Sequence, residues 1–393
     1  ADGHRWATFG AAAVMWDVTS ENFMAPTRSW LDDLQLKLSY GSTGNSGISP
    51  YMALGLVGTG PSYNGQSGTA IANPGNSDLT WETVKIFNVG LHAKVLKRYT
   101  LDAEFYNKVT SNMLMTVPYS YTTGFSEGWG NVAEMVNRGI ELTVSADIIN
   151  NKDWYWNARL TARYNHNEIT KVMNNADAYD YSDLIHFEKG HAFGEHYAVR
   201  WSHVDPRDGQ NVWLDKNGNY TKKYDENDRV LLGKGFKAPW EGSLMTTLSW
   251  KGLQLDVQFN GLFERYLLNN ERWFTENPRF ATQMNQRKEM ATIWTKPGDV
   301  TKIAAANAEY QFDTHLIENA SFVRLKMLQL SYNLPQSILR PTQFIKDAKV
   351  YVVGRNLLTF TDYKGLDPEV DSYSSVTNYP NTRQYSIGVQ LTF

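Results

Sequence analysis

The chain ends in a strict alternation of apolar and polar side chains that stops on an aromatic residue. Between Tyr385 and Phe393, every odd-numbered residue is apolar or aromatic, whereas the even-numbered residues are Ser, Gly, Gln and Thr. A period of two residues belongs to a β-strand with one apolar and one polar face. Such a closing strand is typical of an outer-membrane β-barrel, and the alternative is the edge strand of a soluble β-sandwich.

The same alternation recurs along the chain, and about eleven strands of this kind are expected. The clearest lie at residues 34–41, 87–95, 99–106, 140–148, 154–164 and 253–260. The apolar parity of segment 322–332 switches after Met327, which predicts a β-bulge there. One face of these strands is almost purely apolar, whereas the other carries charges in mid-strand. Because charges need water and the apolar face needs hydrocarbon, the pattern favours a membrane barrel.

The connections between the strands alternate in length. Tight turns are expected at 96–98, 150–153 and 251–252. Mid-length links at 18–32 and 334–347 each have room for a helical turn. Long polar segments are expected at about 45–81, 112–132, 169–239, 268–319 and 361–381. Short turns on one side and long loops on the other are the layout of outer-membrane barrels. This alternation holds along the chain if 191–201 is a loop.

Composition agrees with this interpretation and excludes several classes of function. A net charge of −3 gives no reason to expect nucleic-acid binding. The absence of cysteine excludes thiol nucleophiles and cysteine-based zinc sites. The chain has no apolar run near the roughly 20 residues of a membrane helix, whereas a barrel strand needs only about ten alternating residues.

An odd number of strands predicts that the chain is part of a larger barrel. Bacterial barrels made from a single chain have an even number of strands. An open sheet in lipid would also leave two unpaired edges. We therefore expect an all-β fold, a transmembrane antiparallel β-barrel with roughly twice this strand count, closed by an N-terminal part of the same polypeptide. A homodimer that closes into one barrel is the alternative.

Several stretches resemble the C-terminal half of the SusC/RagA-type TonB-dependent outer-membrane transporters of Bacteroidetes. The stretch Asn131–Leu142 carries this resemblance most strongly. The others are 34–45, 79–82 followed by 87–91, 105–114, 321–326, 354–360 and 365–369. The resemblance covers the whole chain and implies that residues 1–393 are the C-terminal part of a 22-stranded barrel. The N-terminal strands, the plug domain, the TonB-contacting segment and the signal peptide then have no counterpart in this sequence.

The resemblance also implies a location and a function. It implies a multi-pass protein of the bacterial outer membrane, energised through TonB and covered by a SusD-like surface lipoprotein. Such pairs import oligosaccharides, which we favour here, or in some cases oligopeptides. From the residues alone, a passive porin or a structural surface barrel remains the alternative.

The sequence gives no support for an enzyme or for a cofactor. The segment His191–His196 lacks the spacing of zinc-protease motifs and is interpreted as a loop. The segment Asp215–Asn219, with Asp225 and Asp228 nearby, has some features of a calcium-binding loop but lacks its closing glutamate. A hairpin turn around Asn217 and Gly218 is the favoured interpretation, and calcium stays a weaker alternative.

Aromatic platforms beside polar side chains suit the binding of sugars. The candidate substrate-binding residues are the tryptophans of the expected outside segments: Trp129, Trp201, Trp213, Trp273 and Trp294. For each, the alternative is packing within a loop or at the membrane interface. The candidate lumen-lining or plug-contacting residues are polar ones of the strands: Arg159, Arg163, Asp256 and Gln258.

Overall fold

The computed structural model describes residues 3–173, 176–182, 185–370, 374 and 379–393. Its main element is an antiparallel sheet of eleven long strands that follow one another across the sheet in chain order, which confirms the expected strand number and fold class. The strands are β1 (Ala11–Asp17), β2 (Leu31–Asn45), β5 (Glu82–Val95), β6 (Tyr99–Pro118), β7 (Glu127–Asn150), β8 (Trp154–Lys171), β16 (Trp240–Trp250), β17 (Leu253–Phe263), β20 (Phe322–Asn333), β21 (Asp347–Thr361) and β22 (Gln384–Thr392).

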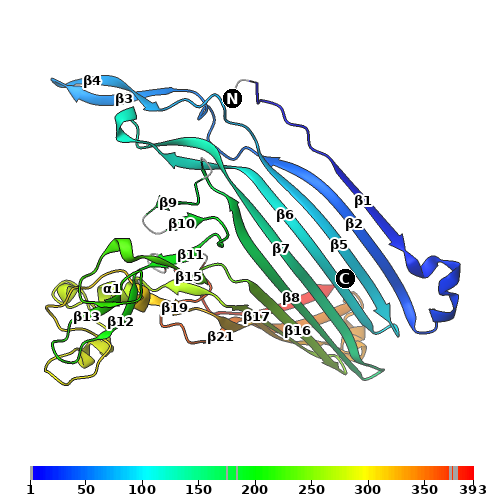
Figure 1. Cartoon of the computed structure of the whole chain (residues 1–393). Helices are drawn as coiled ribbons and strands as arrows, with labels where there is room; N and C mark the ends of the chain where they lie inside the picture. Colours follow the sequence, from blue (N-terminus) through cyan, green and yellow to red (C-terminus); the bar gives the residue numbers. More distant parts are fainter. Residues whose placement is uncertain (1–2, 174–175, 183–184, 371–373, 375–378) are drawn as a thin grey trace. The chain divides into compact units, whose positions relative to one another are not determined.

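The chain divides into two compact units. The first comprises Ala1–Ala146 and Thr161–Phe193, and the second comprises Asp147–Leu160 and Gly194–Phe393. In the first unit, β1, β2, β5 and β6 run side by side (Figure 1). Two hairpins occupy its outer connections. They are β3 (Leu56–Tyr63) with β4 (Gln66–Asn73), and β9 (Ala178–Ser182) with β10 (Ile185–Glu188).

Most of the secondary structure found in the long connections belongs to the second unit. Small sheets pair β11 (Glu195–Ala198) with β15 (Val230–Gly235), β18 (Tyr266–Leu268) with β19 (Ile317–Asn319), and β13 (Asn211–Leu214) with both β12 (Arg200–Val204) and β14 (Tyr220–Thr221). The helix α1 (Glu271–Thr275) lies in the connection between β18 and β19 (Figure 1). A buried cluster supports this region: Val204, Ile303, Ala304, Ala308 and Tyr310.

Strand register shows why the two faces differ. Leu36 pairs with Leu91, Leu91 with Ala103, and Ala103 with Leu142, so one row across four strands is apolar. The next row joins Gln35, His92, Asp102 and Thr143 in the same way. Because paired residues lie on one face and successive residues alternate between faces, the sequence pattern becomes an apolar face and a polar face.

The turns and links at one end of the strands agree with expectation. The turns at 96–98, 150–153 and 251–252 are present, and Lys251 and Gly252 both have the positive φ of a tight hairpin turn. The link at 18–32 holds η1 (Val18–Ser20) and η2 (Asn22–Thr27), and that at 334–347 holds α2 (Gln336–Leu339) and η9 (Arg340–Thr342). Among the described residues, none of the helices is long and apolar enough to cross a membrane.

The structure corrects three details. Segment 112–132 is mostly strand, because β6 and β7 continue pairing beyond register shifts near Asn112, where the alternation is broken. Segment 191–201 is not wholly a loop, but its strands β11 and β12 pair within small sheets and leave the eleven-stranded sheet unchanged. The bulge expected in β20 is present one residue earlier than expected, at Lys326, where pairing with both neighbouring strands shifts.

Candidate functional site

On the polar face of the first unit, side chains join one another across the strands. His92 Nδ1 lies 2.6 Å from Asp102 Oδ1. Tyr106 donates a hydrogen bond of 2.7 Å to Asn165, and Arg163 lies 3.6 Å from the Glu141 carboxylate. Arg163, predicted to line the lumen or contact a plug, is therefore part of this polar face.

The polar face of the second unit is organised around Asp256. This carboxylate is buried and accepts hydrogen bonds from Thr247 at 2.7 Å, Gln254 at 2.8 Å and Gln329 at 3.3 Å. Three strands thus converge on one charge. Gln258, one row further along β17, donates to Asn260, which also accepts a bond from Ser243. Arg159 is exposed on β8, apart from these contacts. A lumen-lining or plug-contacting role stays a prediction for all four candidate residues.

The opposite face of the sheet is apolar and exposed in many strands. On β22, Tyr385 and Ile387 are 74% and 78% exposed, and Phe105 and Ile140 are exposed on β6 and β7. An apolar surface that continues over many strands is far larger than soluble monomers expose. This face therefore suits contact with lipid.

Three of the five candidate tryptophans pack inside the loop structure. Trp213 is 1% exposed, and its indole Nε1 donates to Asp313 at 2.6 Å. Trp201 donates to Asn211 at 2.9 Å, and Trp294 donates to the backbone oxygen of Pro206 at 3.2 Å. Trp201 and Trp294 also pack against the buried cluster of the second unit. These contacts show all three in packing roles, and substrate contact stays a prediction.

The other two tryptophans differ in position. Trp129 lies in strand β7, paired with Thr116, because β7 begins earlier than the sequence predicts. Trp273 lies in α1 with its ring stacked on Phe312 at a centroid distance of 4.9 Å. Phe312 is 39% exposed, so this pair presents a partly open aromatic surface. Trp129 belongs to the first unit and the other four tryptophans to the second.

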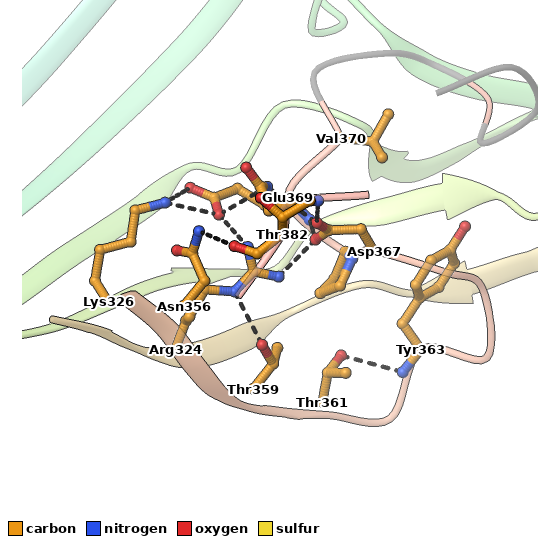
Figure 2. A network of polar contacts seen from close by, with 12 residues as sticks. Arg324, Lys326, Asn356, Thr359, Thr361, Tyr363, Asp367, Glu369, Val370 and Thr382 are labelled. Carbon is orange, nitrogen blue, oxygen red and sulfur yellow. Dashed lines mark hydrogen bonds and ion pairs between the residues drawn. The ribbon is translucent and has the colours of Figure 1, made fainter. Parts of the chain in front are cut away.

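A network of charged residues joins β20 to the connection between β21 and β22 (Figure 2). Arg324 donates a hydrogen bond of 2.6 Å to Asp367, and both side chains are almost completely buried. Arg324 also contacts Glu369, which lies 2.8 Å from the Lys326 ammonium. Burial alone would raise the pKa of Asp367, but the hydrogen bonds from Arg324 and from the backbone of Glu369 and Asn381 outweigh it and hold that pKa below its usual value.

Sequence reasoning did not single out this network. Segments 321–326 and 365–369 stand out in the sequence as motif stretches, but nothing in a strand pattern pairs Arg324 with a residue 43 positions away. The available signal was the presence of two cations in the first stretch and two carboxylates in the second.

The histidines and carboxylates of the outer connections are engaged in local structure. Burial lowers the pKa of His196 to about 4, and its Nε2 donates to the backbone oxygen of Tyr266 at 2.8 Å. Hydrogen bonds from Arg207 and then Lys222 hold the pKa of Asp205 well below its usual value. Across the part of the chain that is described, no group of three or more His, Asp or Glu side chains is arranged to hold a metal ion.

The segment once considered for calcium forms a hairpin turn between β13 and β14, as favoured from the sequence. The Asp215 carboxylate accepts hydrogen bonds from the backbone of Asn217 and Asn219, both at 2.8 Å, and from the Asn219 side chain at 2.9 Å. Its oxygens thus serve the turn itself. These hydrogen bonds lower the pKa of Asp215, and the bond from the Asn219 side chain has the largest effect.

Comparison with known proteins agrees with this geometry. A structure of the RagAB peptide transporter is 36% identical and superimposes with a TM-score of 0.93, covering 100% of this chain and 44% of that chain. The RagAB peptide importer in its "open-open" state gives a TM-score of 0.89 at the same identity, covering 98% of this chain and 42% of that chain. The TonB-dependent receptor SusC of Bacteroides thetaiotaomicron is 27% identical over 419 residues, covering 99% of this chain and 40% of SusC.

The chain spans about two-fifths of the length of the curated relatives that it matches. The family described as "TonB dependent receptor-like, beta-barrel" matches residues 1–357, which is most of the chain. The exposed apolar face of the long strands is what such a barrel presents to lipid. The chain therefore belongs to the TonB dependent receptor-like β-barrel family, in its SusC/RagA-type branch, and its strands cross the outer membrane.

Proposed function

We propose that this chain serves as the C-terminal barrel part of an active importer of oligomeric nutrients, powered through TonB. The observation that carries the proposal is the division of one large sheet into an exposed apolar face and a hydrogen-bonded polar face carrying Arg163, Asp256 and Arg324. A lipid-facing exterior and a polar path are what passage across an outer membrane requires. The likeness to RagAB and SusC over almost the whole chain supports the active rather than the passive form.

The proposed mechanism involves binding and movement but no covalent chemistry. A substrate is captured between the outer connections and a SusD-like surface lipoprotein, and a plug domain is then displaced with energy delivered through TonB. The N-terminal strands, the plug and the TonB contact belong to other parts of the protein. In this chain, the polar face would line the path and contact the plug, as predicted for Arg159, Arg163, Asp256 and Gln258. We propose neither an enzymatic activity nor a cofactor.

For the substrate, we propose oligopeptides. The support is the 36% identity to proteins described as peptide transporters and the presence of ion pairs such as Lys326 with Glu369 beside the polar face, since peptides carry charged ends. Oligosaccharides, favoured from the sequence, remain the second candidate. They are supported by the likeness to SusC and by the partly exposed Phe312 stacked on Trp273.

Uptake by cells that carry the whole protein tests the proposal. Labelled oligopeptides and labelled oligosaccharides are offered separately, with and without TonB. We expect accumulation of peptide that is lost without TonB. Accumulation of glycan alone would assign the second substrate class. Entry that continues without TonB and follows the outside concentration would replace the importer with a passive porin.

A further inference from the structure

The outgoing limb of the connection between β21 and β22 is tied to β20, and the returning limb is tied to the outgoing one. On the outgoing limb, Asp367 accepts a hydrogen bond of 2.6 Å from Arg324, and Glu369 contacts both Arg324 and Lys326. On the returning limb, the backbone and side-chain nitrogens of Asn381 donate to the other oxygen of Asp367 at 2.7 and 2.9 Å. One carboxylate therefore joins the two limbs to each other and to the strand (Figure 2).

The residues that receive this connection belong to the polar face. Arg324 pairs with Asn260 on one side and with Thr359 on the other, and it donates to the Thr359 hydroxyl at 2.9 Å. Asn260 accepts a bond from Ser243 in the same row of the sheet. Lys326 is the extra residue of the bulge, a feature that often redirects a side chain. Here its ammonium reaches Glu369, so the connection lies over the polar rather than the apolar face.

A second arginine fixes the same segment from another strand connection. Arg265, which is 3% exposed, donates to the backbone oxygens of Phe236 at 2.9 Å and Pro368 at 2.6 Å, and also to that of Val370. The backbone of 368–370 is thus held by Arg265, while the Asp367 and Glu369 side chains are held by the charges of β20. This arrangement leaves the segment little freedom to swing away from the sheet.

The pair of Arg324 and Asp367 is better explained by positioning than by stability. Both side chains are almost completely buried, at 4% and 3% exposure, and removing two charges from water offsets much of their attraction. Such a pair instead fixes the position and orientation of the bound carboxylates, because the hydrogen-bond donors of the guanidinium lie in one plane. At the open edge of the network, Lys326 and Glu369 are 31% and 27% exposed and so are presented toward solvent.

We propose that the two described limbs of this connection, residues 362–370 and 379–383, form a fixed inward fold that narrows the path along the polar face, and that Asp367 is the residue positioning them. This fold presents the charged side chains of Lys326 and Glu369 to a substrate that moves along the polar face. That substrate passes along this face rests on the proposed function, whereas the narrowing is a geometric property that can be tested without transport.

The test uses the whole protein in detergent or vesicles. This chain contains no cysteine, so an introduced cysteine is the one thiol among these 393 residues, and any cysteine elsewhere in the protein is first replaced by serine. A spin label on Leu366→Cys reports the motion of the connection, since Leu366 is 67% exposed and makes none of the network contacts. A cysteine at Ser243, in the row of Arg324, reports access to the face beneath. The protein carrying Ser243→Cys is treated separately with a small and with a bulky maleimide, and the rate of each labelling reaction is measured.

We expect Asp367→Asn to loosen the label and to raise the rate of the bulky reagent at position 243 about tenfold, the factor for one lost charge-assisted hydrogen bond. The small reagent is expected to react equally in both proteins. Asp362→Asn is the matched control, because Asp362 lies exposed in the same connection. If Asp367→Asn fails to fold, Asn381→Ala removes the two side-chain hydrogen bonds of the returning limb, to Asp367 and to Glu369. It leaves the backbone bond of residue 381 and the buried ion pair in place.

Equal label motion in Asp367→Asn and Asp362→Asn would overturn the positioning role. A loosened label with no change in the bulky reagent's rate would overturn the narrowing. Absence of any oligomer uptake by the unaltered protein would instead refute the proposed function, and it would leave both labelling results decisive for the fold of this connection.

Discussion

The indole of Trp213 donates a hydrogen bond of 2.6 Å to the carboxylate of Asp313, and both side chains are almost completely buried. The two residues lie 100 positions apart in the sequence, so this bond joins β13 to the connection that precedes β19. Asp313 also accepts a bond of 2.9 Å from the backbone of His315, at the start of a 3-10 turn. The contact therefore holds together two distant parts of the outer loops.

Replacement of Trp213 by phenylalanine should loosen these loops. An aromatic ring is kept, but the second ring of the buried indole is lost and leaves a cavity. The buried Asp313 carboxylate also loses a donor, which costs about 1 to 3 kcal/mol of local stability. We expect faster proteolysis within 194–319 in the folded protein. Tyr220→Phe is the control, because Tyr220 is 72% exposed in the neighbouring β14. Equal cleavage rates for the two variants would show that the bond does not hold the loops.

Acid should weaken the same region through His196. Burial lowers the pKa of this imidazole to about 4, whereas the unfolded chain takes up its proton near pH 6.5. Between these two values the unfolded state binds more protons, so stability rises with pH across this window and is lost as pH falls. The loss of folding stability between neutral pH and pH 4 amounts to about 3 kcal/mol.

Hydrogen exchange of the outer loops, measured from pH 6.5 down to 4, checks this expectation. His196→Gln keeps a side-chain donor for the backbone oxygen of Tyr266 but removes the titrating group. The variant should therefore lose most of the pH dependence. An unchanged slope in the variant would assign the effect to another group.

The long strands could be predicted from the sequence because each of their faces meets one environment. The alternation of Tyr385 to Phe393 is visible for that reason, and so are the eleven strands. The short strands of the outer connections escaped prediction, because β11 and β13 are buried on both faces by loop packing. Trp129 was expected in a loop because irregular pairing near Asn112 hides the continuation of β6 and β7.

The candidate site was less accessible to sequence reasoning than the fold. A period of two shows which side chains share a face but not which of them meet. The convergence of Thr247, Gln254 and Gln329 on Asp256 depends on the register of three strands. Contacts of Arg324 with Asp367 depend in addition on the course of a loop, which no local periodicity encodes.

Asp256 should contribute to the stability of the barrel wall. Because it is buried and accepts bonds from three side chains, Asp256→Ala leaves several donors unsatisfied and should cost about 1 to 3 kcal/mol. The measurement is the temperature at which the whole protein loses its compact form on electrophoresis. Asp102→Ala is the control, since Asp102 lies on the polar face of β6 but is half exposed. An equal fall of this temperature in both variants would mean that the burial of Asp256 adds nothing to the stability of the sheet.

Neighbouring positions on β6 test the assignment of the two faces. Phe105 is 43% exposed on the apolar face, and Glu104 follows the opposite parity. An arginine in contact with the lipid midplane costs roughly 2 to 4 kcal/mol, whereas one on a wet face costs little. We therefore expect Phe105→Arg to reduce insertion of the whole protein into vesicles and its resistance to denaturant. Glu104→Arg should behave like the unaltered protein, because Glu104 pairs with Glu141 and the substitution replaces a like-charge pair by an opposite one. If Glu104→Arg were the more damaging change, the polar side chains of this sheet would face the lipid or the packed interior, and neither the proposed path nor the inward fold at Asp367 could stand.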